Sequence, residues 1–350
     1  MKKQNNRDDY IQMIPFKKKI IKKYININEL GISIGINANV NIICQDFLPE
    51  SYFADYNKYS EEANIYLVYL PGFIENSEYD YIPKHFIKKS NRMYKQGIEN
   101  TIYVDEKAAM TVFHYPYHAL IYSNFNLNET FICCGNMNTL ELCAKSAIKQ
   151  TLATGLLTQK RYVLHASAVS DGRNAFILLA GGRAGKTTTY LNLLCNGFKA
   201  MNDDFIFISI RDNQIIVEAL PSYVSIRESS LKYIKKLPVL NMSDYQKGLE
   251  GEIYINPCKE LHVEHIFQAP LEKIIIPNIG FEKNNIYKVN PIIARRRLIR
   301  SLSALNPQFK ITSDITELVT ALENKSYYMA EISEDTEDFN IKIIDILMNS

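Results

Sequence analysis

The chain has 350 residues, enough for two domains, with 47% hydrophobic and 22% charged residues. Its formal net charge of +2 argues against a chain-wide field that would attract nucleic acid or an anionic membrane. No apolar run approaches the roughly 18 residues of a membrane-spanning helix. Residues 1–23 are polar and basic without an apolar core, so we expect no signal peptide, a cytoplasmic protein and reduced thiols at all six cysteines.

The N-terminal part of the sequence is rich in strand-like patterns. Residues 24–44 alternate between apolar and polar side chains, and residues 64–70 form a short apolar run that ends at a Pro-Gly pair. Residues 109–124 and 130–134 also predict strands. We therefore expect a β-rich region over 1–137, for which substrate recognition is our working hypothesis.

A helix is predicted from Asn138 to Leu157, at the start of a second domain over 138–350. Leucine, isoleucine and alanine side chains recur along it at helical spacing. Asn138 can cap this helix, and Glu141 stands three residues later, as in a capping box.

The second domain combines predicted strands and helices, and we expect an α/β (α+β) fold. Two apolar strands, at 162–169 and 175–180, are joined by residues 170–174, whose sequence SDGRN favours a tight turn. A helix is expected at 186–196, with Gly197 as its C-cap. Further predicted strands lie at 205–210, 215–220, 252–255, 261–267, 272–277 and 326–332, and further helices at 314–324 and 335–349.

A glycine-rich loop follows the strand at 175–180. Its sequence AGGRAGKTT fits the phosphate-loop pattern GxxxxGK[ST], except that Ala180 replaces the first glycine. Small residues let successive backbone N–H groups point at phosphate oxygens, and the following helix adds its positive N-terminal end. Lys186 would reach the β- and γ-phosphates and Thr187 would ligate Mg²⁺. The predicted nucleotide-binding residues are Gly181, Gly182, Arg183, Ala184, Gly185, Lys186, Thr187 and Thr188. The alternative is a structural turn with a chance lysine.

Two further features point to chemistry near this loop. Asp203 and Asp204 precede an apolar strand, where two adjacent carboxylates are costly unless they face a cation or a reacting group. One carboxylate would then bind Mg²⁺ and the other would act as a general base on an incoming hydroxyl, while the alternative is an exposed acidic turn. His165 lies inside the predicted strand at 162–169, where a lone histidine is more often a core residue than a catalyst.

The order of these pieces resembles the catalytic domain of the HPr kinase/phosphorylase family. The matching stretch begins at Val163-Leu164-His165-Ala166-Ser167, continues through the loop, and ends at Asn202-Asp203-Asp204. The separations between His165, Lys186 and Asp203 are also similar to those of the family. The resemblance covers about residues 139–350.

The resemblance implies a phosphoenolpyruvate-carboxykinase-like phosphate-loop core, ATP and Mg²⁺ as cofactors, and transfer of the γ-phosphoryl group to a Ser or Thr hydroxyl. Lys186 and Thr187 carry over directly. The acid that matches Asp204, or Asp203, would be the base, and the histidine that matches His165 would support it. We assign Thr187 and Asp203 as the metal ligands of this expected site.

Departures from the family pattern indicate which members of the family this chain resembles more. Arg183 stands where the family has glycine, and Thr188 stands where HPr kinase carries an acid. The differences favour similarity to stand-alone relatives, such as lasso-peptide kinases, which phosphorylate a precursor peptide. The expected partner is therefore a peptide or protein with a Ser/Thr hydroxyl.

Two other functions remain open from the sequence. One is a kinase for a small hydroxylated metabolite, and the other is a nucleotide-binding module without transfer, to which the Ala180 and Thr188 departures point. Arg295–Arg297 with Arg300 are typical of a solvated helix face, with an acidic peptide as an alternative ligand. His262 and His265 would point to opposite faces of a strand, which argues against a metal site.

Overall fold

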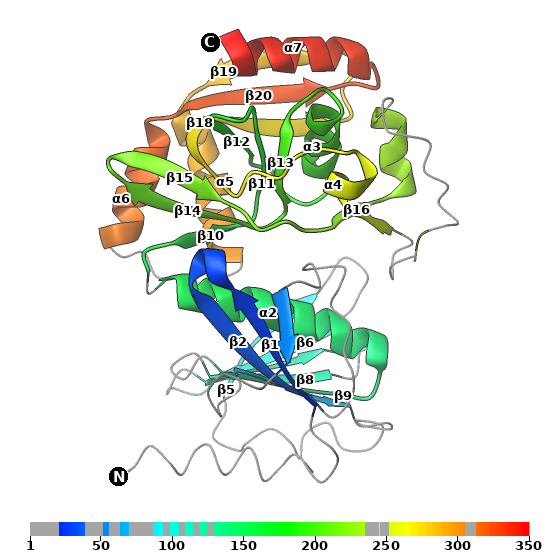
Figure 1. Cartoon of the computed structure of the whole chain (residues 1–350), viewed down its shortest axis with the longest axis vertical. Coiled ribbons are helices and arrows are strands. Elements are labelled where there is room, and N and C mark those ends of the chain that lie inside the picture. Colours follow the sequence, from blue (N-terminus) through cyan, green and yellow to red (C-terminus); the bar gives the residue numbers. More distant parts are fainter. Residues whose placement is uncertain are drawn as a thin grey trace. The chain divides into compact units, whose positions relative to one another are not determined.

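The computed structural model describes residues 21–38, 52–55, 64–69, 87–93, 99–104, 109–114, 119–124, 129–157, 159–234, 245, 252–304 and 313–349. Predictions for the remaining residues lie outside this part of the chain. The described residues form a mixed α/β structure (Figure 1). No helix among them is both long and apolar enough to span a membrane.

Backbone contacts divide the chain into two compact units. Unit 1 comprises Met1–Gln45 with Pro49–Leu156, and unit 2 comprises Asp46–Leu48 with Leu157–Ser350. This division places the helix before Leu157 in unit 1, whereas the sequence analysis assigned 138–350 to the catalytic domain.

Unit 1 contains a nine-stranded sheet in the order β3-β1-β2-β4-β9-β8-β7-β6-β5. Strand β4 pairs in parallel with β2 and β9, and the other pairs are antiparallel. The sequence analysis predicted no strand where β5 and β6 lie. The strands are β1 (Ile21–Ile27), β2 (Ile32–Ala38), β3 (Phe53–Asp55), β4 (Ile65–Tyr69), β5 (Ile87–Met93), β6 (Glu99–Val104), β7 (Ala109–His114), β8 (Ala119–Asn124) and β9 (Glu129–Cys134), with a short 3-10 helix η1 (Asn28–Leu30) between β1 and β2.

Helix α2 (Met137–Leu157) begins close to its predicted position, but its cap is a different residue. The backbone N–H of Thr139 donates to Asn136 Oδ1 at 3.1 Å, so Asn136 is the N-cap. The expected cap, Asn138, lies within the first turn. The prediction was wrong because Asn136 and Asn138 both precede apolar residues at helical spacing, and only the backbone path selects between them.

Unit 2 is built on a sheet whose longest strand is β18 (Gln268–Ile279). Strand β18 pairs in parallel with β12 and β20 and in antiparallel with β15. The strand order is β10-β14-β15-β18-β12-β11-β13, with β20 and then β19 branching from β18. These strands are β10 (Tyr162–Leu164), β11 (Ser167–Ser170), β12 (Ala175–Leu178), β13 (Lys199–Asp203), β14 (Ile206–Arg211), β15 (Gln214–Glu218), β19 (Asn285–Val289) and β20 (Ser326–Ile332).

Helices and a small hairpin complete unit 2. Strands β16 (Val224–Ile226) and β17 (Ile253–Ile255) form a separate two-stranded sheet. Residues 326–332 were predicted as a strand, and β20 confirms it. The helices are α3 (Lys186–Leu194), α4 (Pro257–Glu260), α5 (Pro291–Ala304), α6 (Ser313–Glu323), α7 (Thr336–Asn349) and the 3-10 helix η3 (Glu228–Tyr233).

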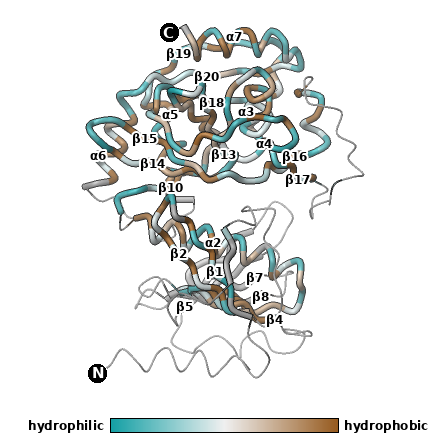
Figure 2. The backbone as a smooth tube through the Cα atoms, viewed as in Figure 1, coloured by the Kyte–Doolittle hydropathy of each residue, from teal (hydrophilic) through white to brown (hydrophobic). Residues whose placement is uncertain are grey.

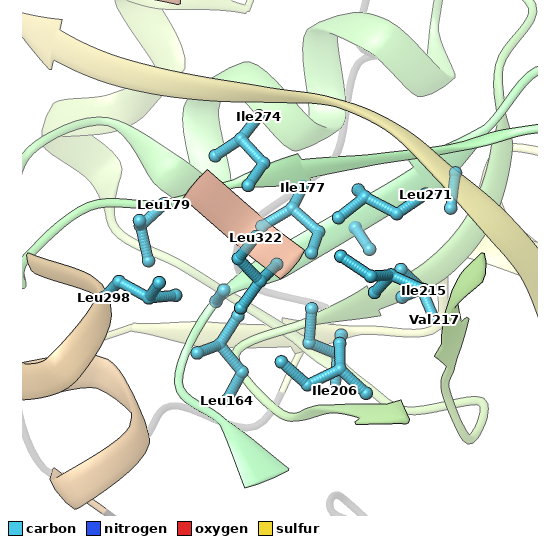
Figure 3. Packing of buried hydrophobic residues seen from close by; sticks show 14 of the residues in the cluster. Leu164, Ile177, Leu179, Ile206, Ile215, Val217, Leu271, Ile274, Leu298 and Leu322 are labelled. Carbon is cyan, nitrogen blue, oxygen red and sulfur yellow. The ribbon is translucent and has the colours of Figure 1, made fainter. Parts of the chain in front are cut away.

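Both faces of the β12–β18 region are buried. On β12, Ile177 faces one hydrophobic cluster while Phe176 and Leu178 face another. The first cluster includes Leu298 of α5 and Leu322 of α6 (Figure 3). The second includes residues of α3 and α7, and α7 carries alternating hydrophilic and hydrophobic segments in Figure 2, as expected for a helix that packs one face on a core. Burial on both faces explains the continuous apolar runs in these strands.

Two predicted strands of unit 2 were wrong. The run at 162–169 is broken into β10, which pairs with β14, and β11, which pairs with β12 and β13. The run at 261–267 forms only an isolated bridge, between His265 and Ala200. His262 there has a φ of 53°, a left-handed conformation that a continuous strand does not accommodate.

Candidate functional site

The glycine-rich loop lies between the end of β12 and the start of α3. Gly181, Gly182 and Arg183 are exposed, so the loop is open to a ligand. Helix α3 begins at Lys186, and the backbone N–H groups of its first turn have no acceptor within the helix. A strand that enters such a loop and a helix that leaves it are the surroundings that an anion-binding loop requires.

Gly185 has a specific steric role in this loop. Its φ is 100°, a region that favours glycine. A Cβ atom at this position would lie 2.5 Å from Cγ2 of Ile279, at the end of β18. The loop therefore approaches β18 closely, and only glycine fits at its junction with α3.

The Lys186 side chain folds back under the loop. It is 8% exposed, and its ammonium donates to the carbonyl oxygen of Ala180 at 3.2 Å. Its Nζ also lies 3.2 Å from Nε2 of His165. A buried ammonium needs such partners because desolvation of a charge is costly.

Asp203 lies at the end of β13 in a group that we call the Asp203 cluster (Ser167, Thr187 and Asp203). Ser167 Oγ donates to Asp203 Oδ1 at 2.5 Å, and Thr187 Oγ1 donates to Asp203 Oδ2 at 2.7 Å. Burial raises the pKa of Asp203, an effect that the two hydroxyl hydrogen bonds and Lys186 oppose and the charge of Asp204 reinforces. Each carboxylate oxygen therefore has one protein donor.

Asp204 lies in different surroundings, in what we call the Asp204 pair (His165 and Asp204). Oδ1 of Asp204 is 3.0 Å from Nδ1 of His165, and the two side chains are 44% and 30% exposed. Because the ammonium of Lys186 can only donate, Nε2 of His165 accepts from it. We therefore assign a neutral imidazole whose Nδ1–H donates to Asp204.

Long-range contacts hold the Asp204 pair in place. His165 lies in the break between β10 and β11, where its carbonyl accepts from Ser301 Oγ at 2.7 Å and its N–H donates to the Ser301 carbonyl at 3.3 Å. Ser301 belongs to α5. Asp204 has a φ of 121°, and its N–H donates to the carbonyl of Ala166 at 3.3 Å. This unusual backbone conformation turns the Asp204 side chain away from the Asp203 cluster.

Five predicted site residues come from separate parts of the chain and lie together in the structure: His165, Lys186, Thr187, Asp203 and Asp204. Thr188 is also in the predicted loop, but it is 3% exposed, so its side chain is buried. The sequence analysis did not single out Ser167 for any role. Its only signal is the strand register, which pairs Ser167 with Asp203 across β11 and β13.

Other candidates from the sequence lie in structural contacts. Nε2 of His265 is 3.0 Å from the carbonyl oxygen of Met201, and no group of three or more metal-binding side chains occurs among the described residues. Arg295 forms an ion pair with Glu323 of α6 at 3.2 Å.

The donor set of the Asp203 cluster fits Mg²⁺. Thr187 Oγ1 and Asp203 Oδ2 are oxygen donors 2.7 Å apart, beside the loop that would hold phosphates. Mg²⁺ prefers oxygen ligands and in nucleotide sites usually takes only one or two from the protein, the rest being water and phosphate. These two residues are therefore the ones that would hold the ion.

The likeness of the chain to known proteins is distant. No family model matches the chain, and no curated protein matches it. Among solved structures, the HPr(Ser) kinase/phosphatase from Coxiella burnetii matches with a TM-score of 0.32 and 13% sequence identity, over 53% of this chain and 88% of that one.

Proposed function

We propose that the chain is an ATP- and Mg²⁺-dependent kinase that transfers the γ-phosphoryl group of ATP to a Ser or Thr hydroxyl of a peptide or protein. One observation carries the proposal: two adjacent carboxylates have separate partners. Asp203 is buried against Thr187, and Asp204 is accessible beside His165. Phosphoryl transfer to a hydroxyl needs these two functions, a metal ligand and a base.

The loop and Lys186 would bind the phosphates. The exposed backbone of Gly181–Arg183 and the start of α3 offer N–H groups to an anion. Lys186 Nζ would leave Ala180 and His165 and point at the β- and γ-phosphates. This movement would exchange contacts of the ammonium with a neutral carbonyl and a neutral imidazole for hydrogen bonds in which both partners are charged.

Thr187 and Asp203 would hold Mg²⁺. A bound Mg²⁺ neutralises charge that develops on the phosphate oxygens during transfer. Asp203 suits this role because its position is fixed by two hydroxyl donors and because solvent reaches little of it.

Asp204 would act as the general base. Its carboxylate is accessible to an acceptor hydroxyl and would take that proton as the oxygen attacks the γ-phosphorus, while the P–O bond to the β-phosphate breaks and ADP leaves. The Nδ1–H of His165 donates to Oδ1 of Asp204 and so orients the carboxylate. His165 itself stays fixed through its backbone bonds to Ser301.

For the acceptor, we infer a peptide or protein, including a natural-product precursor peptide, with unit 1 contributing to its recognition. Support comes from the departures at Arg183 and Thr188, which favour the stand-alone peptide kinases over HPr kinase. Mass spectrometry after incubation with ATP and candidate peptides tests this inference. Phosphorylation of sugars or amino acids but never of peptides would instead support a metabolite kinase.

ATP binding and turnover in Lys186→Ala and Asp204→Asn test the central proposal. Lys186→Ala should lose ATP binding, whereas Asp204→Asn should bind ATP and lose turnover. Asp212→Asn, in the exposed turn between β14 and β15, is the matched control for Asp204→Asn. A wild-type protein that binds no ATP would refute the proposal, and ATP binding whose slow turnover is unchanged in Asp204→Asn would favour a non-catalytic nucleotide-binding module.

A further inference from the structure

We propose that Ser167 is a positioning residue that fixes the carboxylate of Asp203 for metal binding. This inference rests on the proposed function, which it deepens. It concerns a side chain that neither the phosphate-loop pattern nor the acidic pair includes.

The geometry around Asp203 supports this role. Its two oxygens have different partners: Thr187 donates to Oδ2 and Ser167 donates to Oδ1. A carboxylate with one fixed oxygen cannot rotate about its last bond without breaking that hydrogen bond. The hydroxyl of Ser167 donates to a carboxylate oxygen, and hydrogen bonds to a charged acceptor are stronger than those between neutral groups.

The strand register makes this contact a fixed feature. Ser167 lies opposite Asp203 in the antiparallel pair β11–β13 and opposite Leu178 in the pair β11–β12. Residues that face each other across strands have neighbouring side chains. Ser167 is fully buried, so its hydroxyl needs a protein acceptor, and Asp203 Oδ1 is that acceptor.

These contacts assign different roles to the two carboxylate oxygens of Asp203. Oδ2 lies beside Thr187, the other expected metal ligand, while Oδ1 is held on the far side by Ser167. Partners that hold a metal ligand from behind typically contribute 10- to 100-fold to metal affinity. Removal of the Ser167 hydroxyl should therefore weaken metal binding and leave phosphate binding by the loop unchanged.

The chain offers a matched control on the same strand. Ser170 is also fully buried, but its hydroxyl donates to the carbonyl of Asn174 at 2.8 Å and accepts from the N–H of Gly172 at 2.9 Å, in the turn between β11 and β12. Ser170→Ala removes a buried hydroxyl without touching the Asp203 cluster. It reports the cost of losing such a hydrogen bond on this strand.

The test compares Ser167→Ala, Ser167→Cys and Ser170→Ala with the wild type. Mn²⁺ serves as the probe, titrated with a non-hydrolysable ATP analogue present and followed by the electron paramagnetic resonance of free Mn²⁺. The Kd for Mn²⁺ should rise about tenfold or more in Ser167→Ala and in Ser167→Cys, which keeps the volume but only a weak donor. It should stay within about twofold of the wild type in Ser170→Ala, the size of change expected where no metal contact is lost.

Two results would overturn the inference, and they are distinguishable. If the wild type binds Mn²⁺ and Ser167→Ala and Ser167→Cys bind it equally well, Ser167 only packs β11 against β13, and the proposed function still stands. If the wild type binds neither the ATP analogue nor Mn²⁺, both proposals fail. Binding of the analogue in EDTA, which should be equal in all four proteins, separates a metal effect from a damaged loop.

Discussion

The Asp203 cluster and the Asp204 pair are built on adjacent residues, but their carboxylates differ in burial and in hydrogen-bond partners. Asp203 is the last residue of β13 and points into the protein, whereas Asp204 follows it with a positive φ and points to a half-exposed histidine. A single backbone step therefore separates a buried carboxylate that suits a metal from an accessible one that suits proton transfer. Two adjacent acids can serve two different functions here because their side chains contact different partners.

The largest predicted effect comes from removal of the Asp204 carboxylate. Asp204→Asn should lower kcat by about a thousandfold, since general-base catalysis contributes about 10²- to 10⁴-fold. Steady-state kinetics at saturating ATP and acceptor measure the effect. The thermal midpoint should change little because the side chain is 44% exposed. A kcat within tenfold of the wild type would remove Asp204 from the role of base.

The second prediction concerns removal of the Asp203 carboxylate. Asp203→Asn should raise the concentration of Mg²⁺ needed for half-maximal turnover by about 10- to 100-fold, because an amide replaces a charged metal ligand. Titration of activity with Mg²⁺ at fixed ATP measures it. Asp204→Asn is the internal control: its residual activity should keep the Mg²⁺ dependence of the wild type. Equal shifts in both variants would mean that the two acids share one function.

A third prediction distinguishes the roles of the two ring nitrogens of His165. The amide nitrogen of Asn can replace Nδ1, which faces Asp204, whereas the amide of Gln reaches toward the position of Nε2, which faces Lys186. His165→Asn should therefore retain about tenfold more kcat than His165→Gln, since a hydrogen bond to a charged group contributes about 1.5–3 kcal/mol. The two variants should bind ATP within a small factor of each other. Equal loss of kcat in both would mean that His165 acts through Lys186 or through packing.

Several features were predictable from local sequence. The small residues of the loop, the apolar strand before it and the helix after it depend on neighbours in the chain, and β12, α3 and β20 lie where the pattern placed them. The hairpin turn at 170–174 has the same origin, because Asp171 and Gly172 favour turns in almost any context.

The break at His165 and the role of Ser167 were not predictable in this way. His165 is hydrogen-bonded to Ser301, 136 residues away, and nothing in the run 162–169 signals that its continuous apolar pattern forms two strands with different partners in the sheet. Ser167 faces Asp203 only because β11 and β13 pair in one particular register. Such facts belong to the assembled sheet, and a single sequence read in short windows does not contain them.

The smallest predicted effect concerns the stability cost of the Asp203 cluster. Burial raises the folded-state pKa of Asp203 above its ordinary value of 3.8, so the folded state binds this proton more tightly than the unfolded chain does. The contribution of Asp203 to stability is therefore favourable below pH 3.8 and is lost as pH rises through the folded-state pKa. At pH 7 the ionised carboxylate is a net cost that Asn would not carry, and the hydroxyls of Ser167 and Thr187 can donate to or accept from the amide.

Asp203→Asn should accordingly raise the free energy of unfolding at pH 7 by on the order of 1 kcal/mol, as replacements of strained active-site residues often do. Urea denaturation at several pH values between 4 and 8 measures it, and the gain should shrink as pH falls toward 3.8. Asp204→Asn, half in solvent, should show a smaller gain. A less stable Asp203→Asn at pH 7 would mean that the two hydroxyl hydrogen bonds outweigh the burial of charge. The contrast between the two acids would then lie in their reach toward metal and acceptor, and not in the free energy of their surroundings.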